Sequence, residues 1–395
     1  MPDVSYTRDA LIERARALVP ELRKRSVETG RARMLPKQTI DDFWNADLWY
    51  LLKPKRFGGP EVRLNDALAV AGELGRGDGS AAWIWTILGI HDLLICYFPE
   101  SAQKKYWAKD RTLAASSFAP TGVAKPVDGG FTVSGRWSFC SGIDYADWMI
   151  LTVRAGMRSN DPPVPDLRFV LVPRSDFRVI DDWHVMGLQG TGSKTCVVEN
   201  IFVPVDRAIS VEDCRSGSTP GAEVHAASNL YRTPLWSIFP FCISSSVSGI
   251  ARGAFEAFLE SVRNRESRAE QAPVSKRPSI QLRVAEAGAL IDAADLLYKR
   301  ALNETVDLIM SGKTVPLELR VRNRRDQGYT VKTAKQALEL LLTAEGSAGL
   351  FEDHHVQRAF RDLQAITAHI VGGWDNAALC YGSVTLGNPP TDLLW

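Results

Sequence analysis

The chain has few cysteines and histidines and no excess of charge of either sign. Its 395 residues include six cysteines and six histidines, and 47 lysines and arginines stand against 46 aspartates and glutamates, for a net charge of +1. This balance gives no support for a nucleic-acid partner or an anionic membrane surface. The cysteines are scattered without a CxxC pair, which favours reduced thiols and a cytoplasmic protein. No Cys, His and carboxylate spacing suits zinc or iron, so we expect no metal site.

A secretion signal and a membrane span are also missing from the sequence pattern. The N-terminus runs directly into a charged helical stretch, unlike the apolar core of a signal peptide. The apolar stretch 81–98 contains His91 and Asp92, which favours a buried helix over a membrane span. We therefore expect no membrane partner.

Three regions with different residue patterns follow one another along the chain. Apolar residues at helical spacing over the first 110 residues predict an all-α domain. From 114 to about 210, β-branched and aromatic residues alternate between turns, which predicts a barrel or sandwich of short antiparallel strands. Helical patterns then return as four long helices, which suggests a bundle. The predicted fold class is α+β multidomain, with domains at 1–110, 111–215 and 216–395.

The expected elements can be placed by residue. Helices are predicted at 6–30, 38–46, 64–76, 80–97, 99–107, 231–263, 280–310, 317–344, 353–370 and near 374–385. Strands are predicted at 131–140, 148–153, 168–172, 177–180, 195–198 and 201–203.

Residues 131–142, Phe-Thr-Val-Ser-Gly-Arg-Trp-Ser-Phe-Cys-Ser-Gly, are the stretch around which the chain is organised. Large apolar side chains, Trp137 and Phe139 among them, alternate with small polar ones, which predicts a half-buried strand. The strand ends at Ser141-Gly142, where glycine lets the backbone turn and approach a flat ligand closely. The aromatic ring and the hydroxyls could hold a planar heterocycle, or the strand could simply pack a core. The stretch by itself leaves both interpretations open.

A second stretch, Gly187-Leu-Gln-Gly190-Thr191-Gly192-Ser193-Lys-Thr195, is rich in glycine. It is not a triphosphate-binding loop, because Ser193 separates the last glycine from the lysine and a strand pattern follows instead of a helix. Such a loop offers backbone N–H donors to a ligand's edge or to a phosphate, although a plain turn fits the pattern equally well. No GxGxxG follows a strand, so no nicotinamide-dinucleotide site is predicted.

Two histidines are candidates for proton transfer. Arg358, Asp362 and His369 lie at i, i+4 and i+11 on one face of the predicted helix 353–370. An ion pair between Arg358 and Asp362 would order this helix. His91 lies within an apolar helix. Histidine titrates near neutrality and therefore suits proton transfer, while a purely structural role fits either residue as well.

Several motifs together resemble the acyl-CoA dehydrogenase superfamily over nearly the whole chain. Within it, the chain is similar to the two-component flavin-dependent monooxygenases, the hydroxylase components that act on hydroxyphenylacetate, hydroxylated seco-steroids, polyketide phenols or indole. The matching motifs are Gly77-Asp-Gly-Ser80-Ala-Ala-Trp83, Gly135-Arg-Trp137-Ser-Phe-Cys-Ser141-Gly142, Trp183-His-Val-Met-Gly187-Leu-Gln-Gly-Thr-Gly192-Ser193, Phe202-Val-Pro204, Tyr231-Arg232-Thr-Pro234, and His355-Val-Gln-Arg358-Ala-Phe-Arg361-Asp362 with His369.

This resemblance implies a helical N-terminal domain, a central antiparallel β domain and a C-terminal four-helix bundle, assembled as a homotetramer. Flavin would lie between the β domain and the bundle, and a neighbouring subunit would contribute to its site. The implied flavin contacts are Trp137, Ser138, Ser141 near flavin N5, Gly190, Thr191, Gly192, Ser193, Arg232, and His369 on the reactive side of the ring. The implied substrate contacts are His91, Ser116 and Ser117.

The implied activity is that of the oxygenase component of a two-component flavin-dependent monooxygenase. A separate NAD(P)H:flavin reductase would supply reduced FMN or FAD. Dioxygen would add at flavin C4a, giving a hydroperoxide that the site shields from water. The substrate, a phenol- or indole-type aromatic compound, would be hydroxylated or epoxidised. Ser141 at N5 and His369 at the peroxide would be the catalytic residues.

An acyl-CoA dehydrogenase with bound FAD is the alternative. Short- and medium-chain dehydrogenases often carry their proton-abstracting glutamate in a Tyr-Glu-Gly-Thr stretch after the Arg-Asp helix. This chain reads His369-Ile-Val-Gly-Gly-Trp-Asp375 there, without a glutamate, which weakens the dehydrogenase reading without excluding it. A catalytically silent, oligomeric binding scaffold is a second alternative, and it would bind no flavin.

Overall fold

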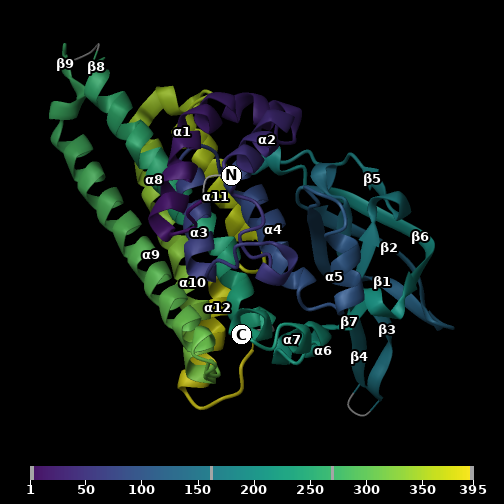
Figure 1. The fold of residues 1–395 in the computed structure, drawn as a ribbon. Helices are drawn as coiled ribbons and strands as arrows, with labels where there is room; N and C mark the ends of the chain where they lie inside the picture. The colour runs from purple at the N-terminus through teal and green to yellow at the C-terminus, as the bar shows by residue number, and fades with distance from the viewer. Residues whose placement is uncertain (1–3, 161–162, 268–270, 392–395) are drawn as a thin grey trace.

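The computed structural model describes residues 4–160, 163–267 and 271–391. Figure 1 shows a body of long helices on one side and a twisted sheet on the other. Helices from both ends of the chain make up the helical body, because α3 packs against α8 and α9 although they are far apart in sequence. The boundary between helices and sheet is therefore formed by segments from all parts of the chain.

The N-terminal helices are α1 (Arg8–Ala32), α2 (Lys37–Asn45), α3 (Leu64–Leu74), α4 (Gly79–Ile95) and α5 (Glu100–Tyr106). Their ends agree with the predicted ranges to within two residues. In α4 every residue except Gly89 is buried, as expected for a helix that is apolar on all sides. This helix contacts α3, α8 and α11 in the helical body and β1 in the sheet. It carries Trp83 and His91, and so positions both at the boundary.

The sheet has the strand order β5-β6-β2-β1-β3-β4-β7. Its strands are β1 (Ala114–Val127), β2 (Gly130–Cys140), β3 (Trp148–Asn160), β4 (Pro163–Pro173), β5 (Arg178–Ile180), β6 (Lys194–Pro204) and β7 (Ala208–Ser210). The predicted strands 195–198 and 201–203 are parts of the single strand β6.

The prediction of an antiparallel β domain is wrong for one pair of strands. β1 and β3 run parallel, with Ala114 opposite Trp148, so the sheet is mixed. β2 returns along β1 to the end where β1 begins. The short connection 141–147 then passes across that end of β1, and β3 must run in the same direction as β1. This crossing places Ser141 at the edge of the sheet that faces the helices.

β2 also ends irregularly. Its register against β6 shifts between Trp137 and Cys140, and Phe139 has a φ of 61°. A positive φ is uncommon for a residue other than glycine, and an irregular register breaks the alternation of side chains. The sequence pattern predicted Phe139 on the same side as Trp137. In the structure Phe139 turns out of the sheet, and its side chain is 73% exposed.

The C-terminal part comprises α6 (Val211–Ser216), α7 (Pro220–Val224), α8 (Leu235–Asn264), the hairpin strands β8 (Glu266–Ser267) and β9 (Ala272–Pro273), α9 (Pro278–Met310), α10 (Leu317–Glu345), α11 (His355–Ala368) and α12 (Trp374–Thr385). α10 packs against α8, α9, α11 and α12, and forms the centre of the bundle. α8 starts four residues later than predicted, because Thr233 precedes Pro234 and adopts an extended conformation.

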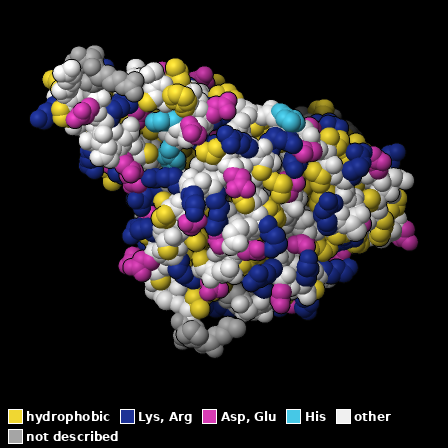
Figure 2. Space-filling model, turned by 90° about the horizontal axis from the view of Figure 1, so that it is seen from above, with side chains coloured by type: hydrophobic (Ala, Val, Ile, Leu, Met, Phe, Trp, Pro, Cys, Tyr) yellow, Lys and Arg dark blue, Asp and Glu magenta, His cyan; other side chains and the backbone are white. Residues whose placement is uncertain are grey.

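Among the described residues, α8 is the one helix that is long and apolar enough to cross a membrane. In its most apolar window 78% of the residues are buried inside the protein, so α8 is a core helix of the bundle. On the face in Figure 2, side chains of both charge signs are interspersed. This distribution agrees with the net charge of +1.

Candidate active site

A chain of buried hydroxyl groups lies where β2 ends. Oγ of Ser141 is 2.8 Å from Oγ of Ser193, which is 2.7 Å from Oγ1 of Thr191. At one end Nε1 of Trp83 donates to Ser141 over 3.1 Å, and at the other Oγ1 of Thr191 donates to the Leu188 carbonyl over 2.8 Å. All three hydroxyl residues are buried. Three residues predicted to bind flavin are thus brought together in one unit, which we call the hydroxyl chain.

Close packing fixes the loop 187–193, which carries two members of the hydroxyl chain. A Cβ on Gly187 would lie 2.0 Å from the Arg361 carbonyl oxygen, and a Cβ on Gly190 would lie 2.2 Å from Cγ2 of Thr29. Only glycine fits such close approaches without displacing the neighbouring helices. The glycines predicted to leave room for a ligand therefore also leave room for α1 and α11.

Two helices also bind backbone amides of this loop. Oδ1 of Asp362 on α11 accepts a hydrogen bond from the Leu188 N–H over 2.6 Å. Oγ of Ser80 on α4 accepts one from the Gly190 N–H over 3.1 Å. The loop was predicted to offer backbone N–H donors to a ligand, and these two are used within the protein instead.

Asp78 and Asp362 are buried carboxyl groups beneath this loop. Asp78 caps α4 by accepting the Ala81 N–H over 2.7 Å. Arg358 lies 3.8 Å from Oδ2 of Asp78, so it approaches this carboxylate, whereas the predicted partner Asp362 bonds to the loop. Burial, and then the negative charge of Asp78, raises the pKa of Asp362 to about 7.

His369 follows the last residue of α11 and faces α4. Its Nδ1 accepts the Val371 N–H over 3.2 Å, and its ring meets the Trp83 ring edge to face at a centroid distance of 5.6 Å. A neutral imidazole has one donor and one acceptor nitrogen, so the proton is on Nε2. Burial, and then the charge of Arg324, lowers the pKa of His369 to about 4. At neutral pH this ring is therefore a neutral hydrogen-bond donor through Nε2.

Arg324 of α10 holds the turn that follows His369. Its guanidinium is buried and donates to the carbonyl of Val371 over 2.6 Å and to that of Ile370 over 3.0 Å. A planar guanidinium suits two acceptors at fixed spacing, which an ammonium group does not match. Arg324 thus fixes the peptide group whose N–H sets the tautomer of His369.

Replacing Arg324 should change the histidine in a predictable direction. Arg324→Met is expected to raise the pKa of His369 because a nearby positive charge is removed, while burial keeps it below the usual 6.5. Arg324→Lys keeps the charge and should leave this pKa low, but should loosen the preference for the Nε2–H tautomer. Ring nitrogen NMR shifts of histidine-labelled protein, followed against pH and assigned with His369→Gln, measure both effects.

Arg322→Lys is the matched control, because Arg322 lies on the same helix and pairs with Glu304 instead. It should change neither the pKa nor the tautomer of His369. An unaltered His369 pKa in Arg324→Met would contradict the assignment.

His91 is held as the opposite tautomer. Its Nδ1 lies 2.6 Å from the Ala114 carbonyl oxygen, which can only accept, so Nδ1 carries the proton and Nε2 has a free lone pair. Burial lowers the pKa of His91 to about 4. Ser116, two residues further along β1, is half-buried, and Oγ of Ser117 donates to the Ser138 carbonyl over 3.1 Å. The boundary between helices and sheet therefore contains one imidazole that accepts at Nε2 and one that donates.

Known proteins share this architecture. Residues 6–112 match the acyl-CoA dehydrogenase N-terminal domain, and residues 241–373 match the acyl-CoA dehydrogenase C-terminal domain. The chain is 34% identical to the flavin-dependent monooxygenase oxygenase subunit HsaA of Rhodococcus jostii, over 97% of this chain and 100% of that protein. The chain belongs to the flavin-dependent monooxygenases of the acyl-CoA dehydrogenase superfamily. This oxygenase component is also 33% identical to the oxygenase component of the FADH2-dependent resorcinol hydroxylase of a Rhizobium species, over 96% of this chain and 95% of that protein.

Solved structures agree with this family. The 3-HSA hydroxylase from a Rhodococcus species superposes on this oxygenase with a TM-score of 0.91 at 32% identity, covering 98% of this chain and 100% of that chain. XiaF from a Streptomyces species, solved with FADH2 and glycerol, gives a TM-score of 0.89 at 28% identity, covering 98% and 97%. The predicted superfamily and fold class are confirmed. The oxygenase reading is supported over the acyl-CoA dehydrogenase alternative.

Trp137 requires a correction. Its ring is fully enclosed in the β domain of this oxygenase, and Nε1 donates to the Thr152 carbonyl over 2.8 Å. A Cβ on Gly122 or Gly135 would lie 2.0 or 2.5 Å from the ring, so the ring occupies the space that these glycines leave open. The structure therefore makes Trp137 a core residue and not the predicted flavin contact. Phe139 is the aromatic residue of this strand that faces outward.

Phe139 forms an aromatic edge with Trp183, and the sequence interpretation gave neither residue a role. The two rings are nearly perpendicular at a centroid distance of 6.0 Å. Nε1 of Trp183 donates to the Leu188 carbonyl over 3.2 Å, which ties this ring to the loop 187–193. An exposed aromatic edge next to buried hydroxyls and a neutral imidazole provides both the apolar contact and the polar groups that a flat heteroaromatic ring needs. These residues fit a flavin.

Ser138 and Arg232 are not members of the hydroxyl chain. Ser138 is exposed, and its Oγ accepts from Oγ1 of Thr195 over 3.3 Å. Arg232 is exposed on the short helix η6 (Asn229–Arg232), which packs beside α7 and α9. None of its described contacts reaches the hydroxyl chain. A flavin contact by Arg232 therefore stays a prediction.

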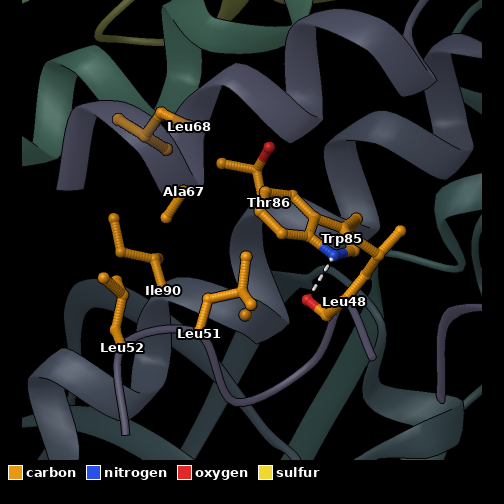
Figure 3. A pocket seen from close by; sticks show the side chains of 9 residues that line it. Leu48, Leu51, Leu52, Ala67, Leu68, Trp85, Thr86 and Ile90 are labelled. Carbon is orange, nitrogen blue, oxygen red and sulfur yellow. Dashed lines mark hydrogen bonds between the residues drawn. The ribbon is translucent and has the colours of Figure 1, made fainter. Parts of the chain in front are cut away.

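An apolar void lies within the N-terminal helices of this oxygenase, next to α3 and α4 (Figure 3). Nε1 of Trp85 donates to the Leu48 carbonyl over 3.0 Å at its edge. The void has a volume of about 10 Å³, room for about one water molecule. It is too small for an aromatic substrate. Its lining residues are Leu48, Leu51, Leu52, Ala67, Leu68, Trp85, Thr86, Gly89 and Ile90.

Proposed function

We propose that this oxygenase hydroxylates or epoxidises a small phenol- or indole-type compound with reduced flavin from a separate reductase. Relatives support this substrate class, among them the oxygenase component of p-hydroxyphenylacetate 3-hydroxylase of Acinetobacter baumannii and the indole-3-acetate monooxygenase of Pseudomonas putida. The observation that carries the proposal is the pair of histidines with opposite tautomers, His91 and His369, at the boundary between helices and sheet. A phenol needs a proton acceptor, and oxygen transfer needs a donor.

Bound reduced flavin, FMN or FAD, would react with dioxygen and supply the oxygen atom that is transferred. Ser141 has a lone pair left to accept a flavin N–H, because its other contacts are the Trp83 N–H and Ser193. Nε2–H of His369 donates to oxygen, and Nε2 of His91 accepts the proton of the substrate hydroxyl. Ser116 and Ser117 would orient the substrate.

The remaining flavin contacts are part of the same proposal. The residues proposed to bind flavin are Ser138, Ser141, Gly190, Thr191, Gly192, Ser193, Arg232 and His369, with Phe139 and Trp183 in place of Trp137. Trp83, which is 6% exposed, would keep water from the reacting atoms.

We also propose a homotetramer in the cytoplasm. Leu282 and Leu296 on α9 are each 68% exposed, and Leu386 after α12 is 81% exposed. Exposed large apolar side chains on a bundle surface favour association with further copies. The described cysteines are buried free thiols, as expected in a reducing compartment.

A rapid-mixing experiment tests the proposed function. The protein is mixed anaerobically with reduced FMN or FAD, and oxygen is then admitted. We expect a transient flavin absorbance that differs from both free oxidised and free reduced flavin, and its decay should yield hydroxylated product when a phenol or indole is present. Yellow protein that an acyl-CoA bleaches anaerobically would support the dehydrogenase alternative. Absence of flavin binding in both redox states would leave the scaffold alternative.

A further inference from the structure

The hydrogen bond from Thr191 to the Leu188 carbonyl gives the hydroxyl chain a direction. Each hydroxyl group has a single proton to donate. Oγ1 of Thr191 donates its proton to the Leu188 carbonyl, so in the 2.7 Å contact Ser193 must donate to Thr191. Ser193 has then no proton left for Ser141, and in the 2.8 Å contact Ser141 must donate to Ser193.

The Leu188 end of the hydroxyl chain sets this order, and the Trp83 end is compatible with it. The indole Nε1–H of Trp83 can only donate, and it points at Ser141. The Leu188 carbonyl can only accept, and it lies at the far end. Ser141 therefore donates its proton to Ser193 and has one lone pair left for a ligand. Toward a ligand it is an acceptor and not a donor.

We infer that Thr191 and Ser193 determine which redox state of flavin this oxygenase prefers, by holding Ser141 as an acceptor. This inference rests on the proposed function, in which Ser141 meets flavin N5. Reduced flavin carries a hydrogen on N5 and can donate to Ser141. Oxidised flavin has only a lone pair on N5, which would meet the lone pair of Ser141. The fixed order of the hydroxyl chain thus favours reduced flavin and disfavours oxidised flavin.

Breaking the hydroxyl chain at Thr191 should weaken this discrimination. In Thr191→Val the shape of the side chain is nearly kept, and the Leu188 carbonyl still accepts from the Thr191 backbone N–H and from Trp183. Ser193 loses its acceptor and is free to donate to Ser141, so that Ser141 can donate to oxidised N5. One hydrogen bond gained corresponds to about fivefold tighter binding of oxidised flavin.

The test compares dissociation constants of reduced and oxidised FMN and FAD, titrated anaerobically for the reduced forms. Wild type should bind reduced flavin more tightly. In Thr191→Val the ratio of the two constants should fall by about fivefold, mostly through oxidised flavin. Ser193→Ala should shift the ratio in the same direction, because it removes the acceptor of the Ser141 proton. It also serves as the second variant in case Thr191→Val does not fold.

Thr152→Val is the matched control, since Thr152 is a buried threonine of β3 whose hydroxyl lies outside the hydroxyl chain. It should leave the ratio unchanged. If wild type binds both forms and neither Thr191→Val nor Ser193→Ala alters the ratio, the inference is overturned. If wild type binds flavin in neither state, the proposed function itself fails.

Discussion

Ser141→Ala is expected to lower, by about tenfold, the ratio of hydroxylated product to hydrogen peroxide formed from the oxygen consumed. The variant removes the lone pair proposed to hold a flavin N–H, and a buried hydrogen bond of this kind contributes about 1–3 kcal/mol. His369→Ala should act in the same direction because it removes the Nε2–H donor. Flavin affinity should change less than product yield, since the loop and the aromatic edge stay in place.

Oxygen uptake measured together with product chromatography and peroxide assay gives this ratio. Ser246→Ala is a suitable control, because Ser246 is a buried serine of α8 that is not a member of the hydroxyl chain. Its ratio of hydroxylated product to hydrogen peroxide should equal that of wild type. Wild-type coupling in both Ser141→Ala and His369→Ala would show that the catalytic roles are assigned wrongly.

The free energy of unfolding of wild type, relative to that of Asp362→Asn, is expected to fall as the pH rises. The pKa of Asp362 is about 7 in the folded protein against an ordinary 3.8, so the folded chain keeps a proton that the unfolded chain releases. Between these values the unfolded state binds fewer protons, and stability is lost with increasing pH. The expected loss between about pH 5 and about pH 8 is about 3 kcal/mol. Asparagine does not titrate and can still accept the Leu188 N–H.

Urea unfolding of both proteins across this pH range measures the effect as a difference. The charges around Asp362 are Asp78, Arg358 and Arg361, and all three are retained in the variant. Asp292→Asn replaces an exposed carboxylate that pairs with Arg252, and should show no comparable slope. A constant stability difference between wild type and Asp362→Asn would mean that Asp362 is ionised throughout.

The helices were predictable from the sequence because their signals are local. The apolar spacing and proline positions place α4 and α11 to within about two residues, and with them Trp83 and His369. The hydroxyl residues of the candidate site were named from motifs that resemble a family, and this family membership is confirmed. What these residues bind among themselves was not predictable, because the hydroxyl chain joins segments about fifty residues apart or more.

The errors arose where distant segments decide the local structure. Alternation predicted Phe139 inside, and the irregular pairing of β2 with β6 turns it outward. The parallel pairing of β1 with β3 depends on a crossing that no local pattern reveals. No local pattern singled out Arg324, because its role depends on the carbonyls of Ile370 and Val371, which follow α11.

The burial of α4 on all sides has a consequence for the synthesis of the protein. α4 ends at Ile95, and its partner α8 begins at Leu235. At about 5–20 residues per second, the ribosome needs roughly ten seconds to make the intervening segment. During this interval the nascent chain holds an apolar helix without the surface that covers it. Chaperone binding to nascent chains should therefore begin once α4 has left the ribosome and end when α8 follows.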